Sequence, residues 1–200
     1  LGLVIGGFGV LFNAAILNRV QVFRNAPVRH ARVWALGVGA VAGGLIVAAP
    51  DLTGGGEGLI VTDLDIPPDL MVLMILLGAR TVLLVSAYSS GVPGGLFAPM
   101  LSIGTAMGLA YGALLTLVGL DFQIETGVFG IAAMGALFAA TVRAPLTGIV
   151  IVVEMTGATG MILPIMITSI VATFTAEALG GRPVYGQLAD RLTVKMGARR

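Results

Sequence analysis

The chain has 200 residues, of which 57% are hydrophobic and 10% charged, and its mean hydropathy is +1.03. Soluble domains carry about 25% charged residues, so this composition predicts an integral membrane protein. The near balance of eleven Lys and Arg against ten Asp and Glu argues against a nucleic-acid partner, and the absence of cysteine excludes disulfides and thiolate sites. Because His30 is the only histidine, we expect no metal site and no cofactor.

Two glycine-rich apolar segments open the chain. Leu1–Leu17 carries a face of small residues, which favours close packing of membrane helices. The residues of this face are Gly2, Gly6, Gly7 and Gly9. Val33–Ala49 is the second segment and ends at Pro50. Between the two segments, the sequence predicts a basic loop that contains Pro27. Its basic residues are Arg19, Arg24, Arg29, His30 and Arg32.

A polar stretch and a third apolar segment follow. Asp51–Asp69 is predicted to be irregular, and its Glu57 fits a solvated loop acid better than a functional carboxylate. Leu70–Tyr88 is apolar except for Arg80. A charge at membrane depth is costly unless it faces protein or water, so Arg80 is a functional or a structural pairing residue, and we favour the structural role.

A glycine- and proline-rich break, Ser89–Pro99, separates the third apolar segment from a fourth, Met100–Leu120. Irregular backbone at membrane depth is stable only where protein or a watery cavity satisfies its polar groups. Glycines allow close approach of the backbone, and the following helix presents its first free N–H groups, so an anion is the natural ligand. A plain turn outside the membrane is the alternative reading. The fourth segment has one small face for helix contact, made by Gly104, Gly108 and Gly112.

The remaining segments are shorter. Gly127–Val142 and Leu146–Val153 are interrupted by Arg143-Ala144-Pro145, and both fall below the roughly 20 residues of a full crossing. They therefore predict a broken or re-entrant helix pair. Met161–Leu179 is the last long segment, with Pro164 in its first turn. We expect residues 1–183 to form a transmembrane domain and residues 184–200 a short amphipathic helix at the cytoplasmic surface, where positive charge accumulates.

The pentapeptide Gly95-Leu96-Phe97-Ala98-Pro99 resembles the GxFxP signature of the CLC chloride channels and chloride/proton antiporters. Three further blocks resemble the same family in the same order: residues 50–58, 129–156 and 163–185. This resemblance implies an all-α polytopic membrane protein, the second inverted-repeat half of the CLC fold, with broken and re-entrant helices. It also implies a transporter or channel for chloride and not an enzyme.

The resemblance implies an anion-binding set made of Gly94, Gly95, Leu96, Phe97, Ala98 and Tyr185. The amides of Leu96 and Phe97 would hold a partly dehydrated chloride, the amide of Ala98 would face the outer pathway, and the Tyr185 hydroxyl would donate to the same ion. Neutral dipoles suit an ion that must also leave. Read without the resemblance, Tyr185 also fits a membrane-surface anchor.

The partners implied by the resemblance are chloride and possibly protons, within a lipid bilayer. It also implies a homodimer through Leu1–Leu17, Leu146–Val153 and Met161–Leu179, in the inner membrane of a prokaryote with a cytoplasmic C-terminus. The family's gating and proton-relay glutamates belong to a first half that no string here matches, so we do not expect this chain to transport alone.

Two other readings use the same features. A secondary carrier for another anion, fluoride above all, would use the same broken-helix logic. An intramembrane enzyme would need paired carboxylates or a Ser/His pair, whereas the candidate acids are scattered at Glu57, Glu154 and Glu177.

Overall fold

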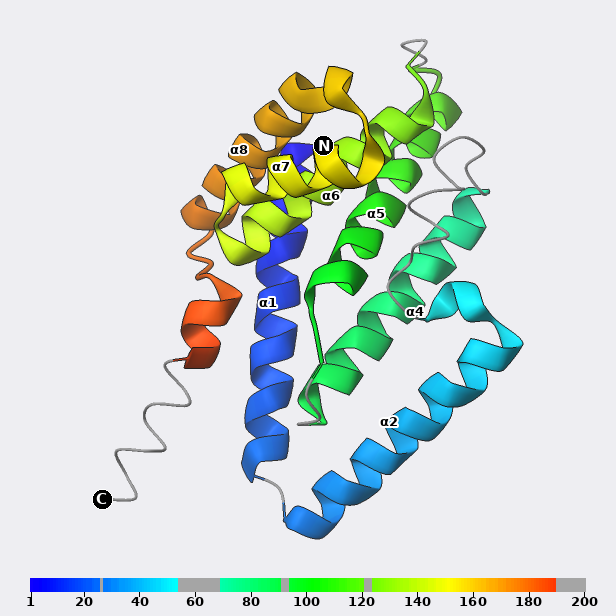
Figure 1. Ribbon diagram of the computed structural model, residues 1–200, viewed down its shortest axis with the longest axis vertical. Coiled ribbons are helices and arrows are strands. Elements are labelled where there is room, and N and C mark those ends of the chain that lie inside the picture. Colours follow the sequence, from blue (N-terminus) through cyan, green and yellow to red (C-terminus); the bar gives the residue numbers. More distant parts are fainter. Residues whose placement is uncertain (26, 54–68, 91–93, 121–123, 190–200) are drawn as a thin grey trace.

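The structure is a computed structural model that describes residues 1–25, 27–53, 69–90, 94–120 and 124–189 (Figure 1). Its elements are α1 (Gly2–Asn25), α2 (Val28–Ala48), η1 (Pro50–Leu52), α4 (Leu70–Ser89), α5 (Phe97–Leu117), α6 (Thr126–Val142), α7 (Pro145–Thr156), η2 (Thr159–Met161) and α8 (Ile162–Ala178). A further helical stretch covers residues 184–189. No strand occurs in the described ranges, so the all-α prediction is confirmed.

The helices form a bundle with one outlying member. In Figure 1, α1, α4 and α5 run lengthwise, α6 and α7 lie across the upper end, and α2 runs along the outside beyond α4. Five of the described helical stretches are long and apolar enough to cross a membrane, including α1, α2, α4 and α5. At about 1.5 Å per residue, the 17 residues of α6 and the 12 of α7 reach only about 26 Å and 18 Å, less than a hydrocarbon core of about 30 Å.

The prediction of a basic loop between the first two segments is wrong. Helix α1 continues past Arg19 to Asn25, and α2 begins at Val28, so Arg29, His30 and Arg32 are helical. The reason is propensity, since arginine, glutamine and valine all tolerate a helix and only Pro27 interrupts one. The connection between the two helices is therefore very short.

Close packing of α5 on α6 follows the predicted glycine face. A Cβ added to Gly108 would lie 2.1 Å from the carbonyl oxygen of Phe129, and one on Gly104 would lie 2.9 Å from that of Ala133. A Cβ on Gly112 would lie 2.8 Å from the ring of Phe129. The prediction of a small-residue contact face is confirmed, and its partner is the backbone of α6 itself.

The glycines of α1 pack inside the same chain. Added Cβ atoms at Gly2 and Gly6 would lie 2.9 Å and 2.6 Å from side-chain atoms of α8, and one at Gly9 would lie 2.9 Å from Ala140 of α6. Only Gly7 lies off this face, because its nearest neighbour atom is 3.9 Å away. The glycine face of α1 is therefore already occupied within one subunit.

The predicted break between the two short helices is confirmed. Arg143 ends α6 in the left-handed region, at φ 66°, and Pro145 occupies the first turn of α7. A non-glycine residue with this φ is uncommon, and several hydrogen bonds made by its side chain, described below, hold it there. The start of α8 also agrees with prediction, since Pro164 lies in its first turn.

Parts of the predictions concern positions outside the described residues. These include Glu57 and most of the stretch from 51 to 69, the residues at 91–93 of the break, and the amphipathic segment beyond residue 189. The division into a membrane domain and a surface helix stays a prediction.

Candidate functional site

The break predicted from glycine and proline leads directly into a helix. Gly94 and Gly95 are exposed and non-helical, and α5 begins at Phe97 with Leu96 as its N-cap. In Figure 1 the chain turns back after α4, and α5 begins partway along the length of the molecule. Leu96 is only 2% exposed and Met100 is fully buried. The start of α5 is therefore set among core side chains, away from the ends of the bundle.

Three backbone N–H groups at this helix start have no partner among the described residues. The first hydrogen bond of the helix runs from the amide of Met100 to the carbonyl of Leu96 at 3.1 Å. Proline at position 99 has no N–H, which leaves the amides of Leu96, Phe97 and Ala98 as the free donors. No side chain caps the helix. These free N–H groups can donate to an external acceptor, and the positive dipole end of the helix favours an anion there.

The aromatic ring of Phe97 is held by packing. It meets Phe138 of α6 edge to face, with ring centroids 5.6 Å apart. Both rings belong to or pack against the main core cluster, which also contains Leu96 and Met100. This contact helps to hold the first turn of α5 against α6.

Tyr185 reaches the same region from the far end of the sequence. Its neighbour Val184 is 1% exposed and lies in the core cluster that contains Leu96. Tyr185 itself is 44% exposed, so its ring is accessible. Its phenol group is close enough to that of Tyr88, near the end of α4, for the two to interact electrostatically. Gly94, Gly95, Leu96, Phe97 and Ala98 thus adjoin one another at the start of α5, and Tyr185 follows a buried residue of the core cluster that contains Leu96. Their joint contact with an anion stays a prediction.

Side chains from two helices hold the segment that leads into Tyr185. Arg143 donates to the carbonyl oxygens of Thr173 at 2.7 Å and Gly181 at 2.8 Å. Asn13, only 3% exposed, donates to the carbonyls of Thr141 at 3.1 Å and Arg182 at 3.2 Å. These bonds tie residues 181 and 182 to α1, α6 and α8. The position of Tyr185 is thus set by the break after α6.

We expect Arg143→Ala to destabilise the protein by about 1–3 kcal/mol, because two backbone carbonyl groups lose their donors and the left-handed backbone at this position loses the hydrogen bonds that hold it. Arg182→Ala is the matched control, since the Arg182 side chain is exposed and makes no hydrogen bond in the described structure. Thermal unfolding of the full-length protein in detergent measures the difference. Equal unfolding temperatures for the two variants would contradict the role given to Arg143.

Arg80 has the structural contacts that its position in an apolar segment predicts. It is 5% exposed, donates to Ser102 Oγ of α5 at 2.9 Å, and donates to the backbone carbonyl of Asp51. Ser102 in turn donates to the carbonyl of Pro99 at 2.9 Å. The guanidinium group of Arg80 therefore joins α4, α5 and η1. Through Ser102 it is connected to the carbonyl of Pro99 in the first turn of α5.

Two cavities adjoin the exposed glycines. One, of about 250 Å³, is lined by Arg80, Gly95 and Pro99 together with residues of α2 and α4. The other, of about 210 Å³, is lined by Tyr88, Gly94 and Gly95, again with residues of α2 and α4. Space for a small ion thus exists beside the glycines, with a buried cation on one side and a phenol on the other.

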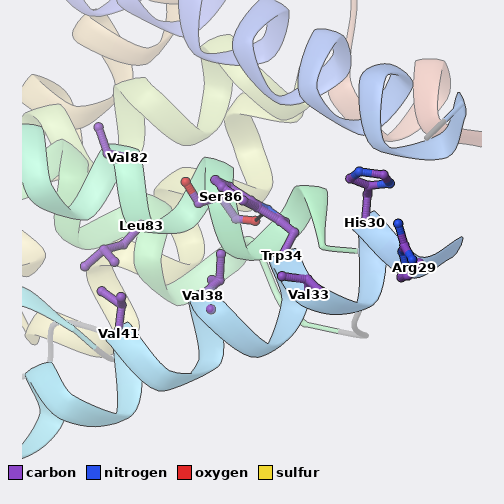
Figure 2. Close-up of a pocket in the computed structure, with 10 residues that line it drawn as sticks. Arg29, His30, Val33, Trp34, Val38, Val41, Val82, Leu83 and Ser86 are labelled. Carbon is purple, nitrogen blue, oxygen red and sulfur yellow. Dashed lines mark hydrogen bonds between the residues drawn. The ribbon is translucent and has the colours of Figure 1, made fainter. Parts of the chain in front are cut away.

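A larger groove of about 950 Å³ lies between α2 and α4. Figure 2 shows Trp34 reaching from α2 toward Ser86 of α4, with Arg29 and His30 at one end. The indole N–H of Trp34 donates to the Ser86 carbonyl at 3.4 Å. Most of the lining is aliphatic, and neither Gly94–Ala98 nor Tyr185 contributes to it. The groove is therefore separate from the candidate anion site.

Two of the candidate acids, Glu154 and Glu177, lie among the described residues. Glu154 is exposed in the last turn of α7, and Glu177 lies 3.9 Å from Arg143 with its side chain 72% exposed. An ion pair of this length with an exposed carboxylate contributes little to stability. Among the described residues no group of three His, Cys, Asp or Glu could hold a metal.

Sequence reasoning did not single out Tyr88, Asn13 or Ser102. Asn13 had a detectable signal, because an amide inside an apolar, glycine-faced helix requires a polar partner. Tyr88 directly precedes the break, and this position in the sequence was the only indication that it lies near the start of α5. Ser102 had none, since its importance lies in accepting a hydrogen bond from Arg80 22 positions earlier.

A bundle of apolar helices, with an uncapped helix start placed among buried side chains, defines a polytopic membrane protein of the broken-helix class. The sequence profile described as voltage gated chloride channel matches residues 1–177. The chain belongs to this family.

Individual relatives agree. The H(+)/Cl(-) exchange transporter ClcA of Vibrio campbellii is 44% identical over 195 residues, 96% of this chain and 42% of that protein. The protein of the same name from Salmonella agona is 40% identical over 203 residues, 99% of this chain and 42% of that protein. The crystal structure of a slow cyanobacterial Cl-/H+ antiporter superposes with a TM-score of 0.90 at 35% identity, covering 98% of this chain and 46% of that one. The chain thus spans less than half the length of these relatives.

Proposed function

We propose that this chain forms one wall of the anion pathway in a chloride/proton exchanger. The observation that carries the proposal is the start of α5, between the buried Leu96 and Met100, where the amides of Leu96, Phe97 and Ala98 are free of described partners and no side chain caps the helix. The names of the relatives, H(+)/Cl(-) exchange transporters, support chloride and protons as the transported ions.

The chemistry of the proposed site suits a transported anion. Chloride is large and has no strict coordination geometry, so backbone amides and a phenol hydroxyl can bind it without a formal charge in direct contact. Binding by neutral dipoles is weak enough for release, which transport requires. Gly94 and Gly95 line a cavity beside the helix start, and the exposed Tyr185 is proposed to add its hydroxyl from the end of the chain.

Two narrower alternatives use the same site. A chloride channel would bind the ion in the same way but would not move protons against it. A carrier for another anion, such as fluoride, would need a tighter site for a smaller ion. The names of the relatives favour the exchanger over both.

We also propose that the protein forms a homodimer in the inner membrane of a prokaryote, with its C-terminus in the cytoplasm. Support comes from large exposed apolar side chains on α7 and α8, among them Leu146, Leu163 and Phe174 at 75%, 58% and 67% exposure. On α1, the exposed Leu3 and Leu11 face away from the glycines that pack on α8. We therefore propose that α1 contributes to the dimer contact through the face that carries Leu3 and Leu11.

The test uses the full-length protein. We expect Tyr185→Phe to raise the chloride Kd about tenfold, because a hydrogen bond to a charged group contributes about 1.5–3 kcal/mol and every 1.4 kcal/mol is tenfold in affinity. Calorimetric titration with chloride gives the Kd. Chloride efflux and proton uptake in liposomes give the coupling.

Tyr111→Phe is the matched control, because Tyr111 packs on Phe129 with ring centroids 5.8 Å apart and lies more than three helical turns beyond the start of α5. It should leave chloride binding unchanged. If neither variant loses chloride affinity, Tyr185 is excluded as a chloride ligand. Chloride efflux with no opposing proton movement would favour a channel, and binding of fluoride in preference to chloride would favour the second alternative.

A further inference from the structure

Tyr88 is a second tyrosine beside the proposed anion path. It lies one residue before the end of α4, and it is half-buried against the core cluster that contains Leu96. The cavity of about 210 Å³ described above is lined by Tyr88 together with Gly94 and Gly95. The ring therefore borders the space next to the start of α5.

The hydroxyl of Tyr88 has no structural partner in the part of the chain described. Neither a backbone carbonyl nor a side chain among these residues accepts its O–H. The other hydroxyl-bearing residues near the end of α4 differ, since Ser89 and Ser90 each donate to a backbone carbonyl of α4, at 2.8 Å and 2.6 Å. Packing alone would be served equally well by phenylalanine, so the hydroxyl group is what requires an explanation.

Tyr185 approaches Tyr88 from the other end of the sequence. The two phenol groups are close enough to interact electrostatically, and Val184, the neighbour of Tyr185, is buried in the cluster against which Tyr88 packs. The two phenol groups thus lie near one another, and one of them, that of Tyr88, belongs to the residue that lines the cavity beside Gly94 and Gly95. A phenol O–H group can donate a hydrogen bond to an anion.

We propose that Tyr88 is a second hydroxyl donor to the transported anion and helps determine which anions the path prefers. This inference builds on the proposed anion-transport function. A hydroxyl stabilises a small, strongly hydrogen-bonding anion such as chloride more than a large, weakly accepting one such as thiocyanate. Tyr88 therefore acts on selectivity, in addition to affinity, through a group that phenylalanine lacks.

Tyr88→Phe in the full-length protein tests the inference, since it keeps the ring and its packing. We expect the chloride Kd to rise about fivefold, within the range of one hydrogen bond to an ion, and the thiocyanate Kd to change less than twofold. Calorimetric titrations with sodium chloride and sodium thiocyanate give both values. Tyr111→Phe, whose ring lies on Phe129, is again the control and should change neither.

A combined variant adds a second readout. If both phenols contact one ion, the effects of Tyr88→Phe and Tyr185→Phe on chloride affinity should be non-additive, whereas two independent sites would give additive effects. An unchanged chloride Kd in Tyr88→Phe, or equal changes for chloride and thiocyanate, would overturn the inference. If Tyr185→Phe weakens chloride binding while Tyr88→Phe does not, the role of Tyr88 is wrong but the proposed anion-transport function stands. If the unmodified protein binds no chloride, both the role of Tyr88 and the proposed function are wrong.

Discussion

Gly108→Ala is expected to destabilise the protein more than any other single change considered. Its new Cβ would lie 2.1 Å from the carbonyl oxygen and 2.5 Å from the carbonyl carbon of Phe129, and both atoms are backbone. A flexible side chain could move aside, but here α5 and α6 must separate. Overpacking costs about 1–3 kcal/mol, and we expect the upper end of that range. At about 2.1 cal/mol/K per residue, this lowers the unfolding temperature of a full-length protein more than twice as long as this chain by about 3 °C.

Gly78→Ala is the matched control for this glycine. Gly78 lies inside α4, also in an apolar helix, and an added Cβ there would meet no atom within 4 Å. Alanine is favoured over glycine in a helix interior by about 1 kcal/mol, so this variant should unfold at the same or a slightly higher temperature. If the two variants unfold alike, close contact between α5 and α6 does not limit stability.

Arg80→Met is expected to have the largest effect on anion binding among residues that need not touch the ion. Arg80 connects through Ser102 to Pro99, and lines a cavity together with Gly95. A unit charge on the order of 10 Å from the ion, at an effective dielectric constant of about 20, contributes about 1.7 kcal/mol, which is more than tenfold in affinity. We therefore expect the chloride Kd to rise at least tenfold. Calorimetric titration of the full-length protein measures it.

Arg80→Lys separates the charge from the hydrogen bonds. Lysine keeps the positive charge but lacks the planar fork with which Arg80 reaches both Ser102 and the carbonyl of Asp51. It should retain most of the chloride affinity and lower the unfolding temperature. Methionine fills much of the volume without a charge, and it also removes the hydrogen bonds to Ser102 and to the carbonyl of Asp51, so the unfolding temperature should fall in this variant too. The opposite ranking, with lysine weakening chloride binding more than methionine, would show that the hydrogen bonds matter and the charge does not.

Features with a local cause could be predicted from the sequence. The spacing of Gly104, Gly108 and Gly112 depends only on helix periodicity, and the break at Arg143-Ala144-Pro145 only on the restrictions that proline imposes. The start of α5 was placed near Met100 and lies at Phe97, within one turn. The loop expected around Pro27 was wrong because charge was taken as evidence against helix, whereas arginine is a good helix former.

Features that join distant residues could not be predicted in this way. Asn13 hydrogen-bonds the carbonyl of Arg182, 169 positions later, and Arg80 finds Ser102 on the next helix. Neither contact has a period or a motif, since each follows from how whole helices cross. The placement of Leu96, Phe97 and Tyr185 as one set came from family resemblance, and their contact with chloride remains a prediction. Tyr88 joined the candidate site only once α4 and residues 184–189 were seen together.

The outlying position of α2 has a consequence for how the protein is made. No described residue of α2 is buried, and its main contacts are with α4 and η1, although the helix is apolar enough to span a membrane. Hydrophobicity alone can insert such a helix, but lateral association needs packing partners. The core of α1, α5, α6 and α8, closed by glycine contacts, can assemble without it. We therefore expect α2 to enter the bilayer as an independent helix during synthesis and to find its final place last.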